Sequence, residues 1–181
     1  MTNINPITQA VCKLVNKHGT RDPFEICFCL DINVHRMELG PALKAYYFCH
    51  SRIKNIVINA DSSDVIQRVL CAHELGHAVL HGKLAAIRGF HELSMYDAVS
   101  RTEYEANLFA AELLIEDEEL FSLLKTDGAS FYDVAKELYV PPELLDFKFK
   151  ALESNGVPVK VPHIARSDFL KNDIPGCFDD F

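Results

Sequence analysis

The order of apolar and polar positions predicts a short helix and three strands in the first third of the chain. Asp22-Pro23 and Glu25 have the form of an N-cap, a first-turn proline and a carboxylate, which open a helix running to about Leu30. Three strands follow this helix, and only Ser51-Arg52 separates the second from the third. We therefore expect these two to form a hairpin in a small, mostly antiparallel sheet. The three strand segments, rich in β-branched and aromatic residues, are 34–39, 45–50 and 53–59.

Two helices of different character follow the strands. Residues 65–80 are apolar on nearly every side of a helix, which places this segment in the core, and Asp61, Ser62 or Ser63 can cap its start. A second helix at 101–115 carries one apolar stripe, which leaves Glu105 and Glu112 to face water. The stripe consists of Ala106, Phe109, Ala110, Leu113 and Leu114.

The last part of the chain predicts two short helices and an irregular extension. After an acidic stretch at 116–119, helices are expected at 130–138 and 142–153, separated by Pro141-Pro142. No internal repeat or Ser/Gly-rich linker occurs before about residue 155. We therefore predict an α+β fold with one domain at 1–155, which includes the helical pair 130–153, and an irregular extension at 156–181.

Composition narrows the class of protein. The 181 residues are 49% apolar and 24% charged, which suits one packed globular core. The net charge of −8 disfavours direct nucleic-acid binding, because such a surface repels phosphates. Without a membrane-length apolar run or a signal core, the expected location is the cytoplasm. The six cysteines lack paired zinc-ribbon spacing and are expected to be mostly buried thiols.

The most specific motif is His73-Glu74-Leu75-Gly76-His77 in the helix expected to be buried. Two imidazoles at i and i+4 share one helix face and can hold one Zn²⁺ at roughly 2.0–2.1 Å each. Glu74 lies about 100° round the helix, where it can reach a water activated by the metal and act as general base. Gly76 costs about 1 kcal/mol relative to Ala in a helix, so it is either packed closely by a neighbour or merely tolerated.

A catalytic zinc needs a third protein ligand, with a fourth position open to water. His81 cannot join both motif histidines, because three ligands over nine residues of one straight helix span about 12 Å. His91 and Glu92, in an expected loop, stay open as alternatives. Glu103 is the better choice, since it opens the second helix after enough chain for an antiparallel return. Asn107, one turn later on the same face, can brace a ligand.

These segments resemble the ImmA/IrrE family of zinc metallopeptidases. The resemblance is carried by HELGHAVLH at 73–81 and EYEANLFAAELLI at 103–115, and it extends over roughly 5–153. One departure is Ile115-Glu116, where such proteins often have Met-Pro. The resemblance implies a zincin-like α+β fold and, for phage and mobile-element members, site-specific cleavage of a helix-turn-helix repressor.

The resemblance also implies a role for each site residue. His73 and His77 would be zinc ligands, Glu74 the catalytic base or acid, and Glu103 the third ligand, as in the gluzincin type. Asn107 falls where a bracing residue is expected. One zinc ion per chain and a protein substrate follow from this interpretation.

The group that would steady the tetrahedral oxyanion is not identified by the sequence. Five side chains are chemically able to donate to it: His81, His91, Tyr46, Tyr47 and Tyr96. An extended substrate could also add to a free edge of the hairpin as a further strand.

Two other functions compete with proteolysis. The spacing within 133–145 is similar to a helix-turn-helix module, but residues 130–153 hold three lysines against five acidic residues, and the second helix offers apolar side chains where base-reading groups would stand. Core packing or docking of another helical protein is a better interpretation of this pair. The stronger alternative is a metal-bound regulator that acts by protein–protein binding, although an intact Glu74 favours catalysis because a structural zinc needs no base.

Overall fold

A computed structural model describes residues 5–41, 43–82, 96–125, 130–160 and 170. Within these residues the chain forms seven helices and one three-stranded sheet, which confirms the α+β class. The elements in chain order are α1 (Pro6–His18), α2 (Pro23–Cys29), β1 (Ile32–Met37), β2 (Ala45–His50), β3 (Ile53–Asn59), α3 (Asp64–Leu80), α5 (Tyr96–Leu114), α6 (Asp117–Leu124), α7 (Phe131–Glu137) and α8 (Pro142–Ser154).

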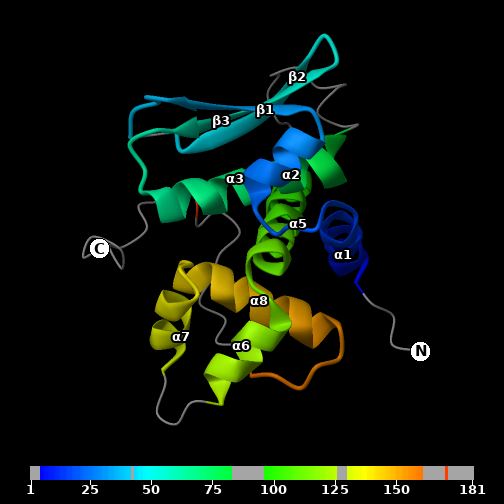
Figure 1. Cartoon of the computed structure of the whole chain (residues 1–181), viewed down its shortest axis with the longest axis vertical. Coiled ribbons are helices and arrows are strands. Elements are labelled where there is room, and N and C mark those ends of the chain that lie inside the picture. The colour runs from blue at the N-terminus through cyan, green and yellow to red at the C-terminus, as the bar shows by residue number, and fades with distance from the viewer. Residues whose placement is uncertain (1–4, 42, 83–95, 126–129, 161–169, 171–181) are drawn as a thin grey trace.

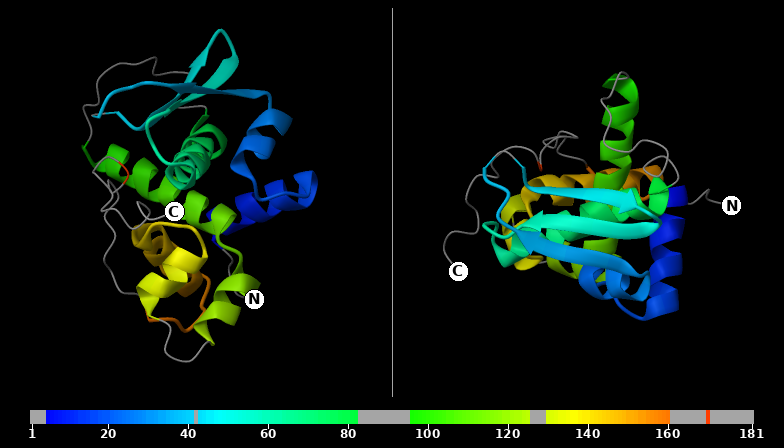
Figure 2. Two further views of the ribbon diagram at one scale, coloured as in Figure 1. Left: turned by 60° about the vertical axis from the view of Figure 1, so that its left-hand side comes forward. Right: turned by 90° about the horizontal axis from the view of Figure 1, so that it is seen from above.

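The layers follow one another from the sheet to the last helices. The sheet covers α3, α5 crosses beneath α3, and α6, α7 and α8 gather at the far end of α5 (Figure 1). The view turned by 60° keeps this order, with α3 between the sheet and α5 (Figure 2). A helix carrying the HExxH motif beneath a small sheet is the arrangement expected of a zincin-like α+β fold.

The sheet has the order β1-β3-β2. The predicted hairpin is confirmed: β2 and β3 pair antiparallel, and the two turn residues Ser51 and Arg52 have positive φ of 50° and 67°, as primed hairpin turns require. β1 pairs with β3 in parallel, with Ile32 opposite Lys54. The sheet is therefore mixed where a mostly antiparallel one was expected, because β1 and β2 run in opposite directions and the hairpin inserts β3 between them.

Local capping signals fix several helix starts. The Asp22 side chain accepts a hydrogen bond of 2.8 Å from the Phe24 amide, as the sequence predicted. Of the three cap candidates for α3, Ser63 takes the position. A reciprocal capping box between Ser130 and Asp133 opens α7. Helices α1 and α6 were not predicted, and the second of them begins where the sequence suggested only an acidic stretch.

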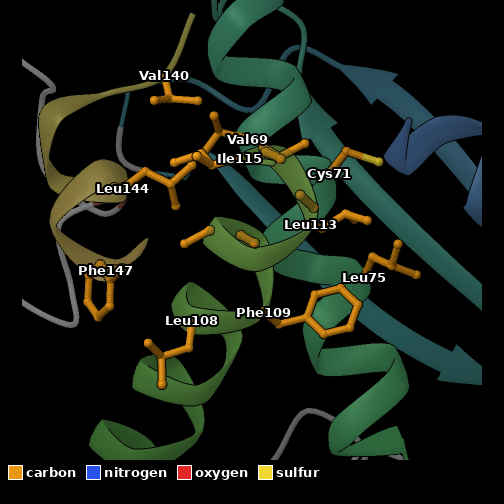
Figure 3. Close-up of a cluster of buried hydrophobic side chains, with 14 of the residues drawn as sticks. Val69, Cys71, Leu75, Leu108, Phe109, Leu113, Ile115, Val140, Leu144 and Phe147 are labelled. Atoms are coloured by element: carbon orange, nitrogen blue, oxygen red, sulfur yellow. The ribbon is translucent and has the colours of Figure 1, made fainter. Parts of the chain in front are cut away.

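The core lies where α3, α5 and α8 meet. Figure 3 shows buried side chains of α3, including Val69 and Leu75, in one cluster with Phe109 and Leu113 of α5 and Leu144 of α8. The whole predicted stripe of α5 is buried. Helix α3 is buried along most of its length, as its apolar composition predicted.

One prediction about the outer face of α5 is wrong. Glu112 is buried and pairs with Lys148 of α8 at 3.1 Å, because α8 covers the face of α5 that was expected to meet water. Lys148, itself almost fully buried, also pairs with Asp117 at 2.5 Å. α5 also begins earlier than expected, at Tyr96.

The helical pair α7–α8 does not present a DNA-reading helix. Most of α8 is buried, including Phe147 and Phe149, and its charged Asp146 and Lys148 are buried too. A recognition helix needs an exposed polar face to enter the major groove. Core packing, the favoured interpretation of this segment, fits the burial of α8.

Three further expectations concern the cysteines, the membrane and the C-terminal segment. Cys27 and Cys71 are buried free thiols with their sulfurs 3.9 Å apart, whereas Cys12 and Cys29 are exposed. Among the described residues, no helix combines the length and apolar character needed to cross a membrane. Of the predicted extension, Val157, Val159 and Leu170 pack against the core. Residues 161–169 and 171–181 lie outside the described residues, so the boundary at residue 155 stays a prediction.

Candidate metal centre

Helix α3 brings the two motif histidines together on one face. The His73 and His77 rings meet edge to face with centroids 4.8 Å apart, and their Nε2 atoms are 3.2 Å apart. His73 is buried and His77 lies in the last turn of the helix. The spacing of one helical turn therefore directs both Nε2 atoms to the same point.

Glu103 reaches that point from α5. Its carboxylate oxygens lie 3.6 Å from His73 Nε2 and 3.5 Å from His77 Nε2. One ligand atom from each of the three residues falls within 4.8 Å of the others, so the group could hold a metal ion. Nothing else among the described His, Cys, Asp and Glu residues forms such a group.

The separations between the two imidazole nitrogens and the Glu103 carboxylate are close to those that tetrahedral zinc requires. Ligands about 2.0–2.1 Å from a tetrahedral Zn²⁺ lie roughly 3.3 Å from one another. The two Nε2 atoms are 3.2 Å apart, and each faces a different oxygen of the Glu103 carboxylate, at 3.6 Å from His73 and 3.5 Å from His77, all close to this value. Two imidazoles and one carboxylate are also a donor set that zinc favours, so the residues fit this metal.

The electrostatics of the site keep Glu103 ionised. Burial by itself would raise the pKa of Glu103, but hydrogen bonds from His73 and His77, together with their charges, hold that pKa well below its ordinary value. Only 18% of the Glu103 side chain is exposed. An anionic oxygen beside two imidazole nitrogens in a shielded position suits a divalent cation.

Asn107 holds the His73 ring in one orientation. It is fully buried on α5, and its Oδ1 accepts a hydrogen bond of 2.8 Å from His73 Nδ1. When the His73 ring is neutral, as a metal ligand must be, this bond keeps its proton on Nδ1 and leaves the lone pair of Nε2 directed at His77 and Glu103. Its place one turn after Glu103 is the one that the sequence suggested for a bracing residue.

Gly76 is packed closely, which decides between the two interpretations of this glycine. A Cβ built on Gly76 would lie 3.2 Å from the Cα of Ala106 and 3.2 Å from Cβ and Cδ1 of Phe109. These distances are shorter than ordinary carbon contacts of about 3.5–4.0 Å. The missing side chain therefore lets α5 approach α3 closely enough for Glu103 to meet the histidines.

Of the remaining candidate site residues, the structure describes Glu74 but not His91 or Glu92. Glu74 is buried on α3, one residue after His73. His91 and Glu92 lie outside the described residues, so they stay untested as alternative ligands.

The structure distinguishes only some of the five candidate oxyanion donors from one another. His91 is outside the described residues, and the side chain of Tyr96 is not described. Tyr47 packs against the core, and its hydroxyl is 4.0 Å from a Cβ built on Gly82, just beyond α3. Burial raises the pKa of Tyr47, which keeps its hydroxyl protonated and able to donate. Tyr46, next in sequence, points to the opposite face of the sheet, where its ring meets Phe48.

His81 has a partner that the sequence analysis did not identify. Its Nε2 lies 3.6 Å from Glu105 Oε2, and Glu105 also bonds Arg101 at 2.8 Å. Burial and the neighbouring His77 lower the pKa of His81. Glu105 is thus not simply a solvated carboxylate, although 26% of its side chain is exposed. The i+4 spacing from His77 to His81 indicated that the two histidines lie close together, but it could not indicate that His81 contacts Glu105 on another helix.

Comparison with known proteins gives three matches. Residues 27–150 match the Peptidase_M78 family, described as the IrrE N-terminal-like domain. The chain is 35% identical over 142 residues to "Uncharacterized immunity region protein 2" of Bacillus phage phi105, which covers 78% of this chain and 88% of that relative. It is 28% identical over 150 residues to "Metallopeptidase ImmA" of Bacillus subtilis (strain 168), covering 82% of this chain and 86% of that relative.

Proposed function

The chain belongs to the Peptidase_M78 family, and on that premise we propose that it is a zinc-dependent endopeptidase whose metal is held by His73, His77 and Glu103. Family membership makes it a metallopeptidase, with a metal and a protein substrate. The choice of zinc is supported by one observation above all, the separation of 3.2 Å between the two imidazole nitrogens, with an oxygen of the Glu103 carboxylate 3.5–3.6 Å from each of them.

In the proposed reaction, peptide-bond hydrolysis, Asn107 and Glu74 have different roles. When bound, zinc supplies Lewis acidity, which activates water and polarises a peptide carbonyl. Asn107 holds the proton of His73 on Nδ1, so that Nε2 is left for the metal. Glu74 takes the proton of the attacking water and delivers it to the leaving amine.

The substrate we propose is a helix-turn-helix transcriptional repressor, cut at one site. The relative from phage phi105 is named for an immunity region, and the relative from B. subtilis is named a metallopeptidase. A substrate segment in extended form could pair with β2, which lies at an edge of the sheet order. Tyr47 on this strand would then stand near the substrate.

A cleavage assay tests the proposal. The zinc-loaded protein is incubated with the helix-turn-helix repressor encoded nearest to its gene, and fragments are identified by mass spectrometry. We expect one cut site, absent with the Glu74→Gln variant, which keeps the metal ligands but lacks the base. No cut, with tight binding of the repressor by both versions, would contradict proteolysis and support the regulator that acts by binding.

A second experiment tests the ligand assignment. Glu103→Ala should weaken zinc retention in a competition with a chelator, because one of three protein ligands is lost. Glu116→Ala is a matched control, since that carboxylate is half exposed and belongs to the turn between α5 and α6. Zinc retention in Glu103→Ala equal to that of the wild type would show that the third ligand lies elsewhere.

A further inference from the structure

The metal site depends on the last turn of α3. His77 lies in this turn, and the helix ends at Leu80. The amide of His81 donates to the His77 carbonyl at 2.9 Å and closes the turn. Helix ends fray because their final carbonyls lack helical partners, so a ligand in the last turn needs support from outside the helix.

The His81 side chain is directed at α5. Only 11% of it is exposed, and its buried Nε2 has no hydrogen-bond partner among the described residues. Glu105 Oε2 on α5 lies 3.6 Å from this nitrogen. The other oxygen of Glu105 accepts a hydrogen bond of 2.8 Å from the exposed Arg101.

Two pairs of side chains therefore connect the C-terminal end of α3 to α5. His77 meets Glu103 at 3.5 Å and, four residues later, His81 at the C-cap of α3 meets Glu105 at 3.6 Å. The His77 and His81 rings are also in contact, with centroids 5.7 Å apart. A displacement of His81 thus acts directly on a proposed ligand.

We infer that His81 and Glu105 are a positioning pair, which holds the last turn of α3 against α5 and so sets the separation between His77 and Glu103. The inference rests on the proposed zinc site. A contact between partly exposed polar side chains contributes little to global stability, at most about 1 kcal/mol. Metal affinity is more sensitive to the pair, because all three ligand atoms must meet one ion at once.

Zinc affinity of purified protein, measured by competition with a chromophoric chelator, tests the pair. We expect His81→Gln and Glu105→Gln each to weaken zinc binding about 10-fold, the lower end of the range for residues that orient ligands. The double variant should lose no more than either single one, because the two residues act as a unit. The melting temperature of the metal-free protein should fall by no more than about 3 °C.

Two control variants match these changes. His35→Gln makes the same substitution at an exposed histidine of β1 and should leave zinc affinity unchanged. Arg101→Gln removes the 81% exposed partner of Glu105 and should change affinity by no more than about 2-fold.

Four results would overturn the inference, and they differ in meaning. Wild-type affinity in both single variants, or losses that multiply in the double variant, would show that the pair does not position the ligands. Weaker zinc binding matched by a comparable loss of apo-protein stability would reduce the pair to a structural contact. Absence of zinc binding in the wild type would remove the proposed metal site itself and the inference with it.

Discussion

Replacing Gly76 by alanine tests how closely the two ligand-bearing helices approach. Gly76 lies between His73 and His77 on α3, and the added methyl would stand 3.2 Å from three atoms of Ala106 and Phe109 on α5. One of these atoms is a backbone Cα and another a Cβ, so no flexible side-chain end can simply move aside. The helices would have to separate by a few tenths of an ångström.

Two opposing effects set the magnitude. Alanine at an unobstructed helix position is about 1 kcal/mol more favourable than glycine. Overpacking a close contact costs about 1–3 kcal/mol. The expected net result for Gly76→Ala is a loss of about 1 kcal/mol in the free energy of unfolding, or about 2–4 °C in melting temperature. Zinc affinity should fall as well, because α5 carries Glu103 away from the histidines.

Urea unfolding of the metal-free protein and a chelator competition measure the two effects. Gly82→Ala is the control, since a Cβ there meets only the Tyr47 hydroxyl at an ordinary 4.0 Å. It should change stability by less than about 0.5 kcal/mol. A Gly76→Ala variant that is stabilised by about 1 kcal/mol, with unchanged zinc affinity, would refute the close approach of α3 and α5.

The remaining predictions concern three contacts: the hydrogen bond between Asn107 and His73, the buried pair of Lys148 and Glu112, and the cap at the start of α7. Asn107→Leu should weaken zinc binding 10–100-fold by titration calorimetry, since His73 loses the acceptor that fixes its ring, and an unchanged affinity would contradict this role. Lys148→Met should cost about 3–5 kcal/mol in urea unfolding because it leaves Glu112 buried and unpaired. Adding Glu112→Met should restore most of that stability, and an equally unstable double variant would contradict the explanation. Ser130→Ala should cost about 1 kcal/mol through loss of the capping box, and a neutral result would show that the cap is dispensable.

Elements with local signals were predictable from the sequence. Asp22-Pro23 with Glu25, and the hairpin around Ser51-Arg52, are specified by residues within a few positions of one another. Helix α1 was missed although Asn5 caps its start and Gly19, with φ of 70°, ends it. Helix α6 was missed because its three first-turn carboxylates, which favour a helix N-terminus, were interpreted only as part of an acidic stretch.

Features that depend on distant segments could not be predicted in this way. The parallel pairing of β1 with β3 depends on where the hairpin inserts, and turn spacing carries no information about that. The burial of Glu112 depends on Lys148, 36 residues later, whereas the stripe on α5 was judged from one helix alone. A single-helix pattern cannot show which second helix covers its polar face.

The candidate metal site likewise combines features that local spacing predicts with features that depend on distant segments. Helical spacing was sufficient to predict that His73 and His77 share a face, because i and i+4 positions are neighbours on any helix. Glu103 was selected from chain length and ligand chemistry, and the family resemblance implied the same residue. The His81–Glu105 contact and the packing at Gly76 depend on how α3 crosses α5, which no local pattern specifies.

The most direct test of the proposed metal centre is anomalous diffraction at the zinc edge from crystals of the zinc-loaded Glu74→Gln variant, which should not turn over substrate. We expect one zinc ion per chain, about 2.0–2.2 Å from Nε2 of His73, Nε2 of His77 and a carboxylate oxygen of Glu103, with the fourth position open to water. Zinc bound without Glu103, or closed off by a fourth protein ligand, would contradict a catalytic metal held by these three residues.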